Sequence, residues 1–72
     1  MKPEHSGAVV ANGKRQEVTL PCSIVDFLAS YGWKVTQVVV ERNGEVIERR
    51  DLSRVMLEDG DRLEIIVPVA GG

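Results

Sequence analysis

The residues with the clearest capacity for chemistry are the last five, Pro68-Val69-Ala70-Gly71-Gly72, which follow a strand-like run of branched apolar residues. Side chains shrink along this segment, and glycine lets a backbone approach another surface closely. A chain end of this kind suits a narrow active site in another protein. Its working group would be the carboxylate of Gly72, which is ionised and a poor electrophile at neutral pH. We therefore expect Gly72 to react only after activation by a partner; a frayed terminus without function is the alternative.

No other group of residues in the sequence is typical of an enzyme. The single histidine, His5, lies in a polar N-terminal segment, and no histidine or cysteine cluster has metal-ligand spacing. The single cysteine, Cys22, comes just before a predicted helix, where a thiol pKa can fall, but we favour the interpretation that it simply fills the helix entry. The sequence therefore predicts a protein that is not an enzyme and that binds no metal or cofactor itself.

Two clusters of charged residues precede the last strand-like run. The basic cluster could bind an anionic group of a partner, but acidic residues are interleaved with it, so a solvated loop is favoured. The acidic cluster is too short for a calcium-binding loop, and we expect its residues to form a turn. The two clusters are Arg49, Arg50 and Arg54, and Glu58, Asp59 and Asp61.

The composition excludes several classes of protein. The chain has 72 residues, 43% apolar and 28% charged, which is typical of one small globular domain. A net charge of -2 lacks the basic footprint of a nucleic-acid-binding protein. The longest apolar run, Ile65–Ala70, is far shorter than the ~20 residues that span a bilayer. We expect a cytoplasmic protein that binds neither nucleic acid nor membrane.

Asparagine-glycine pairs mark two predicted β-hairpins. Asn12-Gly13 and Asn43-Gly44 each lie between two strand-like runs. Both residues of such a pair tolerate positive φ, which a two-residue hairpin turn requires. A fifth strand, with alternating apolar residues, is predicted over Arg62–Val67.

One helix is predicted between the hairpins, from Ile24 to Tyr31. Ser23 can accept a hydrogen bond from the amide of Asp26, as an N-cap residue does. Gly32 then provides the left-handed stop, after which Trp33 should fold back near the helix. The apolar residues form one stripe, at positions Ile24, Phe27, Leu28 and Tyr31.

Two hairpins joined by one helix predict a specific α+β fold. The helix needs a sheet face to cover its apolar stripe, and the economical arrangement pairs the last strand in parallel with the first, Ala8–Ala11. That arrangement is the β-grasp, a mixed five-stranded sheet in order 2-1-5-3-4 with one main helix on one face. We predict a loose N-terminal lead over residues 1–7, the β-grasp domain over 8–67, and a flexible Gly-Gly tail over 68–72.

The alternation of side chains assigns residues to the two faces of the sheet. The predicted core consists of Val18, Leu20, Ile24, Phe27, Leu28, Val38, Val40, Leu57, Leu63 and Ile65. Alternation then turns Val39 and Ile66 to the open face, on adjacent strands. Contiguous exposed apolar residues often mark binding sites. We therefore predict that Val39 and Ile66 form a docking patch near the tail, and that Pro68, Val69, Ala70 and Gly71 also contact partners.

The second half of the chain contains several short motifs, and their order along the sequence is characteristic. They are Asn43-Gly44-Glu45-Val46-Ile47 with Arg49 nearby, Asp59-Gly60-Asp61 followed by Leu63-Glu64-Ile65, and Gly71-Gly72. In this order the chain resembles the ThiS family, the small sulfur carriers of bacterial thiamine biosynthesis. With the first hairpin and the helix, the resemblance covers nearly the whole chain from Ala8. One departure is Arg42, which stands where an apolar residue is usual.

The resemblance implies a β-grasp carrier that is a substrate of other enzymes. A ThiF-type enzyme would use ATP and magnesium to adenylate Gly72. Sulfur from a donor such as a cysteine desulfurase would then convert the adenylate to a thiocarboxylate, and a ThiG-type thiazole synthase would take the sulfur. The segment Pro68–Gly72 is also similar to that of MoaD, the carrier of molybdopterin synthase. A MoaD-like carrier for another pathway, or a ubiquitin-like interaction or modifier module, is therefore the alternative.

Overall fold

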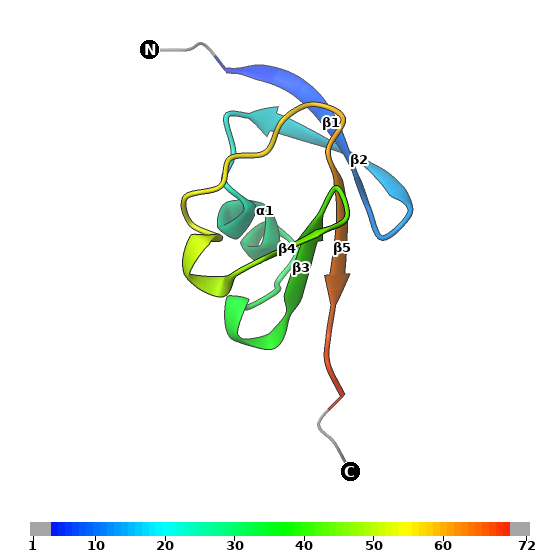
Figure 1. Cartoon of the computed structure of the whole chain (residues 1–72). Helices are drawn as coiled ribbons and strands as arrows, with labels where there is room; N and C mark the ends of the chain where they lie inside the picture. Colours follow the sequence, from blue (N-terminus) through cyan, green and yellow to red (C-terminus); the bar gives the residue numbers. More distant parts are fainter. Residues whose placement is uncertain (1–3, 70–72) are drawn as a thin grey trace.

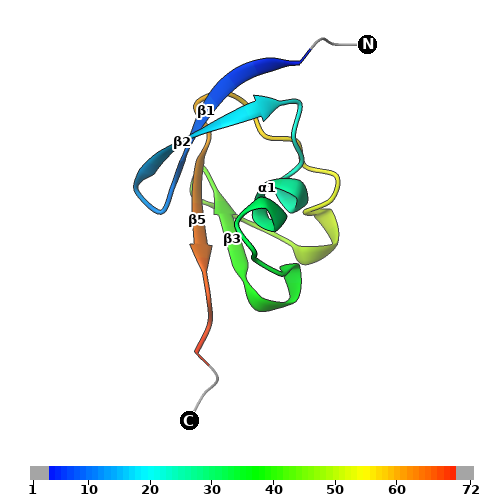
Figure 2. The same ribbon diagram turned by 180° about the vertical axis from the view of Figure 1, so that it is seen from behind.

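The computed structural model describes residues 4–69, which form one mixed sheet with a helix across one face (Figures 1 and 2). Two short 3-10 turns, η1 (Val35–Gln37) and η2 (Arg49–Asp51), connect the larger elements. Those elements are β1 (His5–Ala11), β2 (Lys14–Leu20), α1 (Ile24–Ser30), β3 (Val39–Arg42), β4 (Glu45–Ile47) and β5 (Arg62–Ile66).

The sheet has the order β2-β1-β5-β3-β4, which confirms the predicted β-grasp topology. Strand β5 lies at its centre, parallel to β1, with Val10 opposite Arg62 and Ala11 opposite Leu63. On its other side β5 is antiparallel to β3. Because β5 comes last in the chain, the chain leaves the sheet from its middle strand.

Local sequence signals account for the turns and the helix. Asn12 and Asn43 have φ values of 50° and 52°, each followed by a glycine with positive φ, as two-residue hairpin turns require. The Ser23 hydroxyl accepts a hydrogen bond from the Asp26 amide at 3.0 Å. The helix ends at Ser30, one residue earlier than predicted, because Tyr31 is the C-cap and has left the helical conformation. The Trp33 amide then donates to the Leu28 carbonyl, which confirms the predicted fold-back.

The buried core contains nine of the ten predicted residues, together with Val9 and Leu52. Val18 was predicted to be fully buried, but it is only partly so because it lies on the edge strand β2. Leu52 lies within the arginine-containing segment for which a solvated loop is favoured, and its burial was not predicted. Turn η2 carries it against the helix, where its carbonyl accepts the Val25 amide at 3.2 Å. The core thus extends beyond the sheet and helix to a segment that has no strand or helix pattern.

The strand boundaries differ from the prediction at two places. Strand β1 begins at His5 rather than at Ala8, so the predicted loose lead was wrong for residues 5–7: these pair with Val18–Leu20 of β2. Strand β5 ends at Ile66, one residue early. Among residues 4–69, no helix is long and apolar enough to cross a membrane. The cytoplasmic location stays a prediction.

Candidate functional site

The candidate site begins where the chain leaves strand β5. Val67, Pro68 and Val69 continue past the sheet, at the end of the molecule opposite the start of β1 (Figure 1). Val69 is 92% exposed, and Val67 is about half exposed. Three of the predicted partner-binding or modified residues, Ala70, Gly71 and Gly72, lie outside the described residues. The described part of the tail is therefore an extended, accessible segment rooted on the central strand.

Strand β5 is held on its β1 side by a side chain. Strand β1 ends at Ala11, and the Asn12 carboxamide then replaces the next strand residue. Its Oδ1 accepts the Ile65 amide at 2.7 Å, and its Nδ2 donates to the Ile65 carbonyl at 3.2 Å. The sequence predicted Asn12 only as a turn residue. This bidentate contact secures β5 at Ile65, one residue before the strand ends.

A second asparagine secures the beginning of the same strand. The Oδ1 of Asn43 accepts the Arg62 amide at 2.9 Å, and its Nδ2 donates to Asp61 at 3.1 Å. Both Asn-Gly turns therefore have a second role, since each turn places an amide side chain against β5. The tail starts from a strand that is anchored at both ends.

Asp61 is the centre of a buried polar network at the start of β5. It is 5% exposed, and its Oδ2 accepts the Arg42 Nε at 2.9 Å and the Glu58 amide at 2.9 Å. Burial acts to raise the pKa of Asp61. The hydrogen bonds from Glu58, Asn43 and Arg42, together with the Arg42 charge, outweigh it and hold the pKa below its ordinary value. Asp61 was predicted as a simple turn residue; its partner Arg42 explains its burial.

The predicted apolar pair on the open sheet face is present. Val39 lies directly opposite Ile66 across β3 and β5, and Ile66 is 43% exposed. The adjacent pair on the same face is Glu41 opposite Glu64. Like charges at directly opposed positions repel each other, and the sequence analysis did not identify this pair. The face beside the tail therefore combines an apolar patch with two carboxylates.

The basic cluster does not act as one patch. Arg50 pairs with Glu48 at 2.9 Å on the surface. Arg49 instead lines a shallow hollow at the root of the tail, together with Thr36, Gln37, Val38, Val67 and Pro68. Arg49 is thus next to the tail, whereas Arg50 and Arg54 are exposed to solvent, as the solvated-loop prediction has it.

Cys22 lacks the features of a reactive thiol. Burial raises its pKa, and the nearby Asp26 carboxylate raises it further. Its Sγ donates to the Ser23 carbonyl at 3.3 Å. This agrees with the prediction that it fills the helix entry. Within residues 4–69 no three His, Cys, Asp or Glu side chains are grouped so that they could hold a metal ion.

Comparison with known proteins gives consistent matches over this fold. The model of the ThiS family matches residues 9–72. The crystal structure of a thiamine biosynthesis protein (ThiS) from Geobacter metallireducens has a TM-score of 0.79 and 29% identity, covering 90% of this chain and 99% of that one. An NMR structure of a thiamine biosynthesis protein from the same organism has a TM-score of 0.74 and 29% identity, covering 90% of this chain and 87% of that one.

A longer protein contains a similar segment. A thiazole synthase from Paramagnetospirillum magneticum is 31% identical over 64 residues, which are 89% of this chain and 20% of that protein. This chain therefore spans about a fifth of the length of the curated relative that it matches. The remaining four fifths of the relative have no counterpart in the 72 residues.

Proposed function

Because the chain belongs to the ThiS family, we propose that it is a sulfur carrier of thiamine biosynthesis whose Gly72 carboxylate is converted to a thiocarboxylate. The observation that carries this proposal is the course of the chain end. The central strand is anchored by Asn12 and Asn43, and the exposed segment Val67–Val69 continues beyond it, away from the sheet. A chain end presented in this way can reach an active site that the folded domain cannot enter.

The proposed chemistry activates the carboxylate and then replaces one oxygen by sulfur. In a ThiF-type enzyme, with ATP and magnesium, a carboxylate oxygen of Gly72 attacks the α-phosphate and pyrophosphate leaves. Hydrosulfide then attacks the acyl carbon of the adenylate, and AMP leaves with the oxygen. Where a cysteine desulfurase supplies the sulfur, a persulfide attacks instead, and a thiol then reduces the resulting acyl disulfide to the thiocarboxylate and is itself oxidised to a disulfide. The carrier supplies the reacting carboxylate and no catalytic side chain. It is thus a substrate in this sequence, and it binds no cofactor.

A ThiG-type thiazole synthase is the proposed acceptor of the sulfur. Support comes from the thiazole synthase of Paramagnetospirillum magneticum, in which a segment similar to this chain is part of a longer polypeptide. Covalent linkage of two modules indicates that they work together, because it raises their effective concentration. We infer that this chain works together with a comparable synthase.

Reconstitution tests the proposal. The full chain, incubated with ATP, magnesium, a ThiF-type enzyme and sulfide, should gain the mass of one oxygen-to-sulfur exchange, located in the C-terminal peptide. A MoeB-type activating enzyme in a parallel reaction should convert the chain much less. Equal or better conversion with the MoeB-type enzyme would contradict the thiamine assignment. Isopeptide-linked conjugates, or sulfur on Cys22, would contradict the carrier role.

The apolar pair Val39 and Ile66 is proposed as the docking patch for the ThiF-type enzyme, and Ile66→Glu should weaken that binding at least about tenfold, since central apolar contacts dominate interface energies. The new carboxylate would also lie on the face that already carries Glu41 and Glu64. Titration calorimetry measures the affinity. Because Ile66 is exposed, the free energy of unfolding should change by less than about 1 kcal/mol.

The matched control is Met56→Glu. Met56 is 45% exposed, almost the same as Ile66, but it borders the hollow lined by His5 and Leu20, away from the tail. This variant should bind like the parent. If Ile66→Glu also binds like the parent, or if both variants lose the same affinity, the docking patch is wrongly placed.

A further inference from the structure

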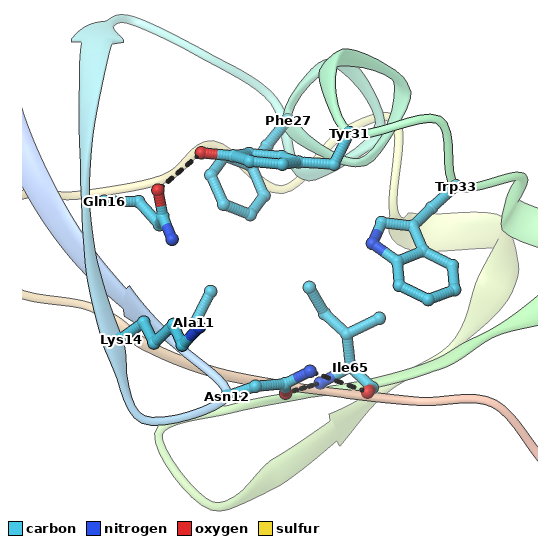
Figure 3. A pocket seen from close by; sticks show the side chains of 8 residues that line it. All are labelled: Ala11, Asn12, Lys14, Gln16, Phe27, Tyr31, Trp33 and Ile65. Atoms are coloured by element: carbon cyan, nitrogen blue, oxygen red, sulfur yellow. Dashed lines mark hydrogen bonds between the residues drawn. The ribbon is translucent and has the colours of Figure 1, made fainter.

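The three aromatic side chains of this protein come together around one pocket. The chain has one Phe, one Tyr and one Trp, and Phe27, Tyr31 and Trp33 all line a cavity of about 270 Å³ between the first hairpin and the helix (Figure 3). Ala11 and Ile65 complete its apolar lining. Phe27 is 3% exposed and Trp33 packs against the core, whereas Tyr31 is 49% exposed and lies against Phe27, with the two ring centroids 5.0 Å apart. Much of the Tyr31 side chain is therefore left exposed beside the pocket.

Hydrogen-bond donors surround the same space. The Tyr31 hydroxyl donates to the Gln16 Oε1 at 2.8 Å, which leaves the Gln16 amide nitrogen turned toward the pocket (Figure 3). The indole nitrogen of Trp33 also faces the space. The third donor is the ammonium group of Lys14, which lines the pocket as well. None of these three nitrogens bonds to another residue within residues 4–69.

Acceptors for these donors are missing from the lining. Among residues 4–69, no carboxylate borders the pocket. The Oδ1 of Asn12 is occupied by the Ile65 amide, and the Oε1 of Gln16 by Tyr31. Aromatic walls favour a flat ring by stacking or edge contact. Donors that include an ammonium group favour an anionic acceptor. The ligand that fits this lining is therefore an aromatic ring that bears a negative charge.

We propose that this pocket binds a small aromatic carboxylate. The ring lies between Trp33, Tyr31 and the side chain of Ile65, and the carboxylate accepts hydrogen bonds from Lys14 and Gln16. The cavity has room for a one-ring ligand, since engineered apolar cavities of about 150 Å³ already hold benzene. The site is on the helix side of the sheet, whereas Val39 and Ile66 lie on the open side. It is therefore separate from the proposed docking patch and independent of the chemistry of the tail.

Nuclear magnetic resonance of the ¹⁵N-labelled full chain tests this site, with 4-hydroxybenzoate as the probe. The single indole N–H signal, that of Trp33, should shift in a saturable manner with a dissociation constant on the order of 1 mM, as expected for about ten ligand atoms. The neutral analogue 4-hydroxybenzamide should bind about tenfold more weakly, because it lacks the charge that Lys14 recognises.

Two variants distinguish specific binding in this pocket from nonspecific binding to the protein surface. Lys14→Gln should raise the dissociation constant for 4-hydroxybenzoate about tenfold and leave that for 4-hydroxybenzamide unchanged. Lys34→Gln, the matched control, removes an exposed lysine that does not line the pocket, and it should bind like the parent. Lys14 is itself exposed, so both variants should fold.

Four outcomes would overturn the proposal. One is an indole signal that does not shift with the probe. Another is equal affinity for the acid and the amide, or equal loss in both lysine variants. The last is a shift that appears only when a ThiF-type or ThiG-type enzyme is added, since this would assign the pocket to a protein interface.

Discussion

Deleting Gly72, or adding one alanine after it, is expected to abolish thiocarboxylate formation while the fold is retained. One added residue moves the terminal carboxylate by about 3.5 Å, and displacement of a reacting group by about 1 Å can already cost a hundredfold in rate. Both variants should therefore react at less than about a hundredth of the parental rate. Intact mass spectrometry of timed samples with the ThiF-type enzyme, ATP and sulfide measures this effect.

Two controls make the result specific. An alanine added before Met1 lengthens the chain equally but does not move the tail, and this variant should react like the parent. Cys22→Ser should also react like the parent, because burial and Asp26 both raise the pKa of that thiol. If the chain extended after Gly72 were thiolated as fast as the parent, the terminal carboxylate would not be the working group.

Asp61→Asn is expected to cause a large loss in the free energy of unfolding. It removes a charge that is 5% exposed and leaves Arg42 without its buried partner. Breaking such a pair costs about 3–5 kcal/mol when both groups are buried. The Arg42 side chain is 22% exposed, so we expect a loss of about 2–3 kcal/mol. A domain of this size has only about 5 kcal/mol in total. Urea unfolding at pH 7 measures the difference.

Glu58→Gln is the matched control, because Glu58 pairs with the same arginine from the surface. The Arg42 Nη2 lies 3.2 Å from its Oε2, and the Glu58 side chain is 78% exposed. Exposed pairs contribute less than about 1 kcal/mol. If Asp61→Asn destabilised the protein no more than Glu58→Gln does, burial would not make the Asp61–Arg42 pair more stabilising than the exposed Glu58–Arg42 pair.

The same aspartate predicts an acid dependence of stability. The pKa of Asp61 is lower in the folded than in the unfolded protein, because its hydrogen bonds and Arg42 favour the ionised form. Its contribution is therefore complete well above the ordinary pKa of 3.8 and is lost as the pH falls below that value. The parent should lose stability over this range, and Asp61→Asn should show a shallower loss. If the free energy of unfolding fell equally with pH in the parent and in Asp61→Asn, protonation of Asp61 would not be the cause of the loss.

The sequence alone determined the elements and their order, because their signals are local. The Asn-Gly pairs allow positive φ at the turns, and Ser23 caps the helix by accepting the amide of Asp26, three residues further along. Alternation assigns Leu63 and Ile65 to one face of the sheet and Ile66 to the other. The topology followed from these, since a single helix stripe needs one sheet face. The assignment of the chemistry to the tail rests on residue types alone and stays a prediction.

Only the tertiary structure decided which distant residues meet. Asn12 contacts Ile65 across 53 positions, and Arg42 meets Asp61 across 19. Alternation gives the face of a side chain, but the residue opposite depends on strand register, which places Glu41 against Glu64. The burial of Leu52 likewise depends on how turn η2 folds against the helix. Such contacts arise when the chain closes on itself, so no local pattern in the sequence contains them.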